Sequence, residues 1–143
     1  MKRILAAMLF TCTLIAAHAQ DTTAPPLPFD SPVSMRAMEA VCTGIGADAR
    51  NDPRWPTYPL RIELVGRAGE YLGAAEVSLT QNSEAIISVR CSGPWLLLRL
   101  PPGNYEVTAS VENVSKTGRV TVPMTGQGRL VLRFPELGQE QAK

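Results

Sequence analysis

The sequence predicts one all-β domain, an antiparallel sandwich of about seven short strands with one disulfide and a flexible N-terminal segment. Short runs in which apolar and polar residues alternate recur at regular spacing, which is typical of a sandwich. Turns rich in glycine and proline separate these runs. Two cysteines, Cys42 and Cys91, remain once an expected N-terminal export signal is removed, and a chain of 143 residues is long enough to bury a core.

The first 19 residues have the pattern of a signal peptide. Lys2 and Arg3 form a positive region, residues 4–16 form an apolar run, and residues 17–19 form a small-x-small cleavage site. The apolar run is shorter than the roughly 20 residues that a membrane-spanning helix needs. We therefore expect cleavage before Gln20, export of the mature chain, and no membrane insertion after cleavage.

Removal of the signal limits the chemistry that is open to the protein. It takes away Cys12 and also His18, the only histidine, so Ser-His-Asp catalysis, Cys-His catalysis and histidine-ligated zinc are excluded. Removal of Lys2 and Arg3 leaves 12 of the 14 basic residues against 13 acidic ones. This balance provides no basic field for nucleic acid. We expect no enzyme activity, no cofactor and no nucleic-acid partner.

The acidic residues do not predict a metal site or a hydrolytic site. Asp48 and Asp52 match no calcium-loop spacing, and Arg50 lies between them, so we expect solvated or capping side chains. Paired carboxylates in a cleft would indicate a glycosidase. The carboxylates on the expected strands instead fall on solvent faces, at Glu63, Glu76, Glu106 and Glu112.

Residues 20–38 are expected to form a flexible lead-in, because their first part is rich in proline and has no periodicity. Two interpretations stay open for residues 31–43. A short helix can start at Ser31, or residues 39–43 can form a short strand. We favour the strand at the Cys42 end of this segment.

The sandwich is expected to span residues 39–135, before a polar tail over residues 136–143. Its early part is compatible with one helical turn over residues 47–52 and with a loop over residues 54–59. The strands follow as alternating or continuous apolar runs, at residues 60–64, 75–80, 87–91, 96–100, 105–111, 120–122 and 130–134.

Cys42 and Cys91 are expected to pair. Cys91 shares an inward face with Ile87 and Val89, and Cys42 directly follows the apolar Val41. Two cysteines in an exported chain are most simply a disulfide, and the alternative is an intermolecular bond or free thiols. The bond would join the segment before the regular strands to the middle of the sandwich, with Trp95 close by.

A sharp corner is expected at residues 101–104, Pro-Pro-Gly-Asn. Proline lacks a ladder donor, and Gly103 and Asn104 tolerate positive φ, so the strand cannot continue. Tyr105 follows directly. A tyrosine at such a corner commonly buries its ring and bonds its hydroxyl to nearby backbone, and the alternative is an exposed tyrosine that stacks on a ligand.

Several of these motifs together resemble a known family. The sequence Leu-Pro-Pro-Gly-Asn-Tyr-Glu-Val at residues 100–107, Gly-Pro at 93–94, Gly-Glu-Tyr-Leu at 69–72 and Gly-Ile-Gly at 44–46 are similar to carboxypeptidase regulatory-like, or transthyretin-like, domains of bacterial envelope proteins. The resemblance implies an immunoglobulin-like or transthyretin-like sandwich, a location in the periplasm of a Gram-negative bacterium, and no catalytic residues. It is greatest to small stand-alone periplasmic members of the family.

Four residues in or beside loops are candidates for binding a partner: Arg54, Trp55, Tyr58 and Trp95. Aromatic side chains next to prolines can anchor a protein or stack on a sugar. The alternative is that Trp95 packs over the disulfide and that Trp55 covers an open end of the sandwich.

We expect a monomeric, non-catalytic binding or structural module that holds an envelope protein or a glycan. The second hypothesis is an inhibitor or immunity-type protein in which Arg54, Trp55 and Tyr58 block an envelope-directed enzyme.

Overall fold

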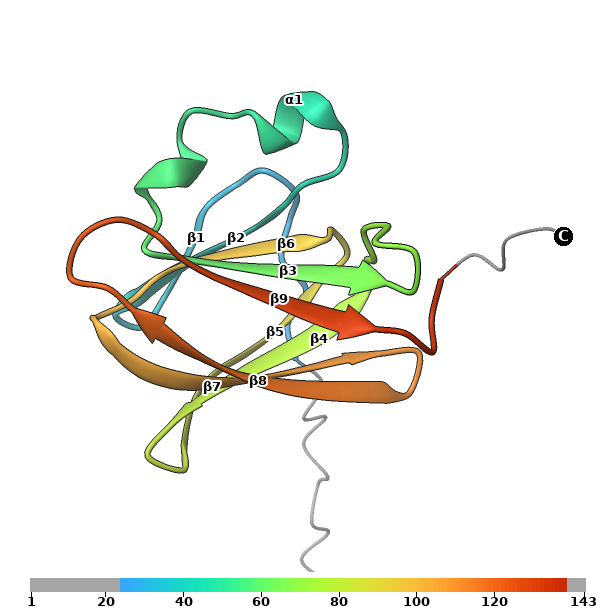
Figure 1. Ribbon diagram of the computed structural model, residues 1–143. Helices are drawn as coiled ribbons and strands as arrows, with labels where there is room; N and C mark the ends of the chain where they lie inside the picture. Colours follow the sequence, from blue (N-terminus) through green and yellow to red (C-terminus); the bar gives the residue numbers. More distant parts are fainter. Residues whose placement is uncertain (1–23, 139–143) are drawn as a thin grey trace, which may run out of the picture.

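The computed structural model describes residues 24–138, which form a two-layered β sandwich (Figure 1). The expected signal peptide and residues 139–143 of the expected tail lie outside the described residues. Nine strands, rather than about seven, are present in the described part: β1 (Val33–Met35), β2 (Met38–Thr43), β3 (Leu60–Gly66), β4 (Ala75–Gln81), β5 (Glu84–Cys91), β6 (Trp95–Arg99), β7 (Gly103–Val111), β8 (Val114–Val122) and β9 (Gly128–Phe134). The all-β prediction is confirmed.

The strands form a five-stranded sheet in the order β1-β2-β6-β3-β9 and a four-stranded sheet in the order β5-β4-β7-β8. The paired strands are antiparallel except β3 and β9, which run parallel in a register that places Arg61 opposite Arg129. The expectation of a wholly antiparallel sandwich is therefore wrong at this pair. Alternation along one strand identifies its faces but carries no information about the direction of its neighbour.

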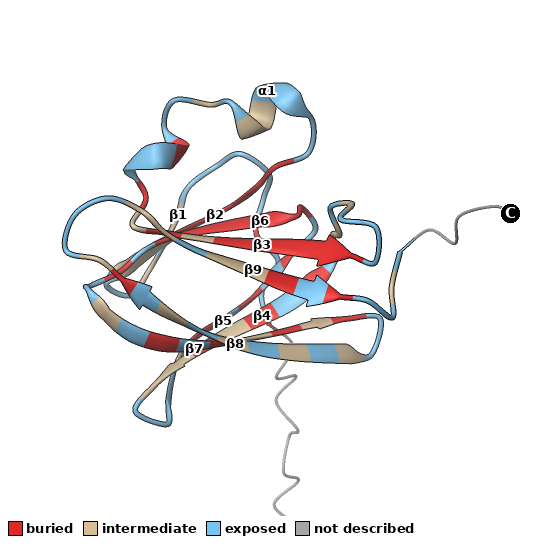
Figure 2. Cartoon of the chain, in the orientation of Figure 1, coloured by how far each residue is buried: buried red, intermediate tan, exposed pale blue. Residues whose placement is uncertain are grey.

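The core lies between the two sheets and is built from the alternation that the sequence shows. Ile62, Leu96 and Leu98 of the five-stranded sheet meet Val77 and Val107 of the four-stranded sheet, and all five are almost completely buried. Figure 2 shows buried residues along strands of both sheets. Burying each aliphatic side chain of this kind contributes about 1.5–3 kcal/mol relative to leaving it exposed.

The N-terminal segment is part of the sandwich from its first described residues, which differs from the expected lead-in. Residues 24–30 bridge the two sheets, through a parallel bridge from Pro26 to Arg90 of β5 and another from Phe29 to Cys42 of β2. β1 then forms a hairpin with β2. The helix interpretation of residues 31–43 is wrong, and the strand at the Cys42 end is confirmed, because the segment can bury Ala40 and Cys42 in the core only as a strand.

The Cys42–Cys91 disulfide joins β2 of one sheet to the end of β5 in the other, with a Cα–Cα distance of 5.4 Å. Both cysteines are almost completely buried. The predicted pairing is therefore confirmed, and the bond crosses the core from sheet to sheet.

The corner lies before β7 but is shorter than expected, because Gly103 and Asn104 already pair with β8 and only Gly103 has a positive φ. The expected role of Tyr105 is confirmed. The ring of Tyr105 is buried, and its hydroxyl donates a 2.7 Å hydrogen bond to the carbonyl oxygen of Pro101. Burial raises the pKa of the Tyr105 hydroxyl. Tyr105 thus fixes the corner rather than presenting its ring to a ligand.

Within residues 24–138, no helix is long and apolar enough to cross a membrane.

Candidate functional site

A second, smaller apolar cluster lies on the outer face of the five-stranded sheet. Between β2 and β3 the chain passes outside this sheet and forms a short helix, α1 (Ala47–Arg50), and a 3₁₀ turn, η1 (Trp55–Thr57), which are seen above β2, β3 and β6 in Figure 1. Trp55 and Tyr58 pack there against Val41 and Leu97. The Trp55 Nε1 group donates a 2.7 Å hydrogen bond to the carbonyl oxygen of Ala49, which fixes α1 over the cluster.

The three candidate aromatic residues are therefore buried. Trp55 is 2% exposed, Tyr58 is 3% exposed and Trp95 is 6% exposed. Trp55 has a covering role, as the alternative interpretation expected, but it covers the outer face of the five-stranded sheet and not an open end of the sandwich. Since the rings of Trp55 and Tyr58 offer almost no surface, they do not form the exposed plug that the inhibitor hypothesis requires.

Trp95 lies on the outer face of the sheet, whereas the disulfide lies in the core. Its position in β6 alternates with the core residue Leu96, and it pairs in register with Thr43 and Glu63. The interpretation that the Trp95 ring packs over the disulfide is therefore wrong, because a shift of one residue along a strand reverses the face. Trp95 is nevertheless close to the bond, as expected, since its carbonyl oxygen lies 3.5 Å from Cys91 Sγ. Gly44 packs directly against the indole, with a φ of +100° and room for no side chain, since a Cβ there would lie 2.9 Å from Trp95 Cγ.

All four guanidinium–aromatic stacks of the described residues lie on this outer face. Arg54 stacks on Trp55 and Arg61 on Trp95 at 4.4 Å, Arg99 on Tyr58 at 4.6 Å, and Arg50 on Tyr71 at 5.1 Å. The rings of Tyr71 and Trp95 also meet edge to face, with centroids 6.2 Å apart. We call this surface the arginine–aromatic face and include in it the neighbouring Glu63, Arg129 and Arg133.

Glu63 is the buried charge at the centre of the arginine–aromatic face. It is 1% exposed, so the expectation that it faces solvent is wrong. Its carboxylate forms ion pairs with Arg129 and, at 3.7 Å, with Arg61. The parallel pairing of β3 with β9 places Arg61 and Arg129 side by side, and this arrangement has one more positive charge than negative. The alternation along β3 correctly placed Glu63 on the outer face of the sheet, but neighbouring side chains cover Glu63 there.

The arginine–aromatic face has more guanidinium groups than its carboxylates neutralise. Arg99 and Arg133 are exposed, and no carboxylate of the described residues lies within 4 Å of either. The Arg129 side chain is 56% exposed although it pairs with Glu63. Two buried N–H donors, Arg61 Nε and Trp95 Nε1, have no hydrogen-bond acceptor in the described residues. The exposed guanidinium groups can therefore meet a partner that supplies negative charge, whereas the two buried donors are out of its reach.

Arg54, the remaining candidate, is exposed but is engaged locally. It forms a 2.7 Å ion pair with Asp52, and hydrogen bonds from the Arg54 side chain and backbone lower the pKa of the Asp52 carboxyl. This pairing uses one of the two aspartates considered for calcium. Within residues 24–138, no group of three or more His, Cys, Asp or Glu side chains is placed to hold a metal ion.

Tyr58 has the largest pKa shift on this face. Its hydroxyl donates a hydrogen bond to the Glu39 carboxylate, and burial together with this bond raises the pKa of Tyr58 to about 12. Because the protonated hydroxyl is favoured in the folded state, its contribution to stability is present below the ordinary pKa of 10. The contribution is lost as the pH rises through about 12.

Replacing Tyr58 by phenylalanine should remove the ionisation that occurs near pH 12. The measurement is an alkaline titration of the folded protein, followed by the ultraviolet absorbance of tyrosinate. The wild type should show one of its three tyrosines ionising near pH 12, and Tyr58→Phe should lack this step. Tyr71→Phe, which alters an exposed ring, is the control and should keep it. A step near pH 12 of unchanged amplitude in Tyr58→Phe would contradict the assignment, because Tyr105, whose pKa burial also raises, is the same in both proteins.

Comparisons with known proteins give no identification: no family model and no curated protein matches the chain.

The important residues that the sequence analysis missed are Arg61, Glu63, Tyr71 and Arg129. Their strand positions showed that Arg61 and Glu63 share a face, and this was the one signal available. The proximity of Arg129 depends on the parallel pairing of β9, and that of Tyr71 on its bridge to Val65.

Proposed function

We propose that this protein is a non-catalytic binding module of the bacterial envelope, exported to the periplasm, which holds an acidic partner protein on the arginine–aromatic face. The observation that carries the proposal is the excess of guanidinium groups on this face, above all Arg99, which is exposed, stacks on Tyr58 and has no carboxylate of the described residues within 4 Å. The location in the envelope rests on the signal-like N-terminus and on the resemblance described above.

Stacking prepares these arginines for binding. A guanidinium held flat against a ring loses less side-chain freedom when a carboxylate arrives, and its planar fork pairs with a carboxylate through two hydrogen bonds. Arg99 is further held by hydrogen bonds to the Thr57 carbonyl oxygen at 3.3 Å and to its hydroxyl at 3.4 Å. Arginine is also among the residues that contribute most at protein interfaces. A rigid sheet face with projecting arginines therefore suits a protein surface that carries carboxylates.

The proposal predicts that charge reversal on this face abolishes capture of the partner. Tagged mature protein is incubated with a periplasmic extract, and stoichiometric partners are identified by mass spectrometry. Arg99→Glu and Arg133→Glu should each reduce recovery of the partner by about tenfold or more, equivalent to at least about 1.4 kcal/mol. Raised salt should release the partner, because screening weakens contacts between exposed charges.

The matched control is Arg36→Glu, which makes the same change of charge in the exposed β1–β2 turn, away from the arginine–aromatic face. It should leave recovery unchanged. Equal recovery with all three variants, or a partner lost only with Arg36→Glu, would refute the proposed face. Recovery of an anionic glycan in place of a protein would refute the assigned partner class but keep the face.

A further inference from the structure

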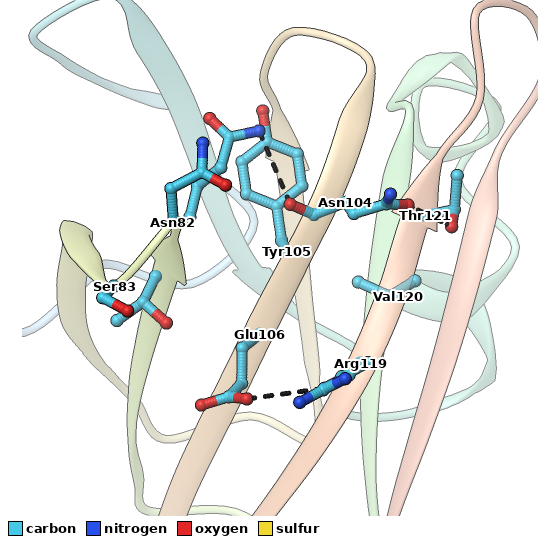
Figure 3. Close-up of a pocket in the computed structure, with 10 residues that line it drawn as sticks. Asn82, Ser83, Asn104, Tyr105, Glu106, Arg119, Val120 and Thr121 are labelled. Atoms are coloured by element: carbon cyan, nitrogen blue, oxygen red, sulfur yellow. Dashed lines mark hydrogen bonds and ion pairs between the residues drawn. The ribbon is translucent and has the colours of Figure 1, made fainter.

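The outer face of the other sheet has a polar hollow of about 540 Å³. Its floor consists of outward residues of neighbouring strands in register. Thr80 of β4 lies beside Glu106 of β7, which lies beside Arg119 of β8, and the next row pairs Asn104 with Thr121. Figure 3 shows the turn residues Asn82 and Ser83 beside these strands, where they form a wall of the hollow. The volume is in the range of small-molecule sites, roughly 300–1,000 Å³.

The wall is a tight turn of defined geometry. Asn82 and Ser83 have φ values of 51° and 64°, so both central residues of the β4–β5 hairpin are left-handed, as a type I′ turn requires. Asparagine is common in this conformation, whereas glycine rather than serine is usual at the second position. The turn fixes the Asn82 amide and the Ser83 hydroxyl beside the floor.

The hollow offers hydrogen-bond donors and acceptors side by side, with no net charge. The Thr121 hydroxyl donates a 2.7 Å hydrogen bond to Asn104 Oδ1, which orients that amide. The Asn104 amino group, the Asn82 amide and the Ser83 hydroxyl have no side-chain partner in residues 24–138. Glu106 and Arg119 form an ion pair at 3.6 Å and neutralise each other.

This combination matches the hydroxyl groups of a sugar. A hydroxyl both donates and accepts, so neighbouring hydroxyls can use amide donors, carboxylate acceptors and protein hydroxyls together. Tyr105 and Val120 also line the hollow, but their side chains pack toward the core, so its open surface is mainly polar. An apolar ligand would leave these polar groups without partners, and an anionic ligand would meet the Glu106 carboxylate.

We infer that the hollow binds one unit of a neutral saccharide, with Asn82, Ser83, Asn104 and Glu106 as its hydrogen-bonding residues. The site lies on the opposite sheet from the arginine–aromatic face and does not depend on the function proposed for that face. A shallow polar site with a few hydrogen bonds should bind with a dissociation constant in the millimolar range. A protein with both sites would join a glycan to a partner protein.

The test is a titration of the isotope-labelled protein with maltose and with N,N′-diacetylchitobiose, followed by amide chemical shifts in two-dimensional NMR. At least one disaccharide should shift amides of residues 80–83, 104–106 and 119–121 and leave those of the arginine–aromatic face in place. Asn104→Ala removes the oriented amide. Ser83→Gly removes the hydroxyl but suits the left-handed turn. Each should weaken binding by about tenfold, equivalent to the loss of about 1.4 kcal/mol.

Thr117→Ala is the matched control, because Thr117 lies on the same sheet face in β8, bonded to Thr108 and outside the hollow. It should bind both disaccharides as the wild type does. The inference is overturned if neither disaccharide shifts the hollow at tens of millimolar, if Asn104→Ala and Ser83→Gly bind like the wild type, or if inorganic phosphate produces the same shifts. Because Arg99→Glu should bind the disaccharide normally, failure here is distinguishable from failure of the arginine–aromatic face.

Discussion

Replacing both Cys42 and Cys91 by alanine should lower the free energy of unfolding by about 4 kcal/mol. The bond closes a loop with a sequence separation of 49 residues, and the chain-entropy model assigns roughly this stabilisation to a loop of that length. It also joins the two sheets across the core, so its loss frees the β2 end from β5. Since a domain of this size has a total stability of about 5–15 kcal/mol, the effect should be a large fraction of the whole.

The measurement is urea unfolding of the oxidised wild type and of the double alanine variant, followed by circular dichroism. A thiol assay of the wild type in denaturant without reductant is the control and should detect no free thiol from Cys42 or Cys91. The midpoint of unfolding should be clearly lower in the variant. Equal midpoints, or two reactive thiols in the native wild type without reductant, would contradict a structural disulfide.

Replacing Trp55 by alanine should lower the free energy of unfolding by about 3–5 kcal/mol, the usual cost of removing a buried tryptophan. The side chain fills the cluster with Val41, Tyr58 and Leu97, and its N–H group holds the Ala49 carbonyl. Its loss should leave a cavity between the sheet and the α1–η1 segment. Chemical denaturation of Trp55→Ala beside the wild type measures the effect.

Trp55→Phe keeps an aromatic ring in the cluster, and it loses the donor to Ala49 together with part of the buried ring volume. Trp55→Phe should lower the free energy of unfolding clearly less than Trp55→Ala does. A Trp55→Ala variant as stable as the wild type that loses partner binding would contradict the structural role and restore Trp55 as a direct binding residue.

The sequence patterns predicted what depends on neighbouring residues. Alternation in β4 and β7 identified their buried faces, and the Pro-Pro-Gly-Asn corner predicted the conformation of Tyr105, because turn chemistry and side-chain direction act within a few residues. The disulfide followed from the number of cysteines that remain after the expected cleavage. These features required no knowledge of which strands are neighbours.

The candidate sites could not be predicted without knowing which strands are neighbours. The residues of the hollow come from the β4–β5 turn, β7 and β8, and they meet only because the register aligns Thr80, Glu106 and Arg119. On the other face, the position of Arg129 beside Glu63 depends on a parallel pair between strands that are distant in the sequence. Single-strand patterns contain neither register nor direction.

The sequence by itself thus determined an all-β sandwich, its buried faces, its disulfide and its tyrosine corner, since each follows from local alternation, turn residues or cysteine count. Only the tertiary structure decided that Trp55 and Tyr58 are covered, that Glu63 is buried, and that the exposed Arg99, Arg129 and Arg133 share the outer face of the five-stranded sheet. The physical reason is that solvent exposure depends on what packs over a face. Here the segment that covers Trp55 and Tyr58 consists of a short helix, a 3₁₀ turn and the loops that connect them, and no periodicity predicts its path over the sheet.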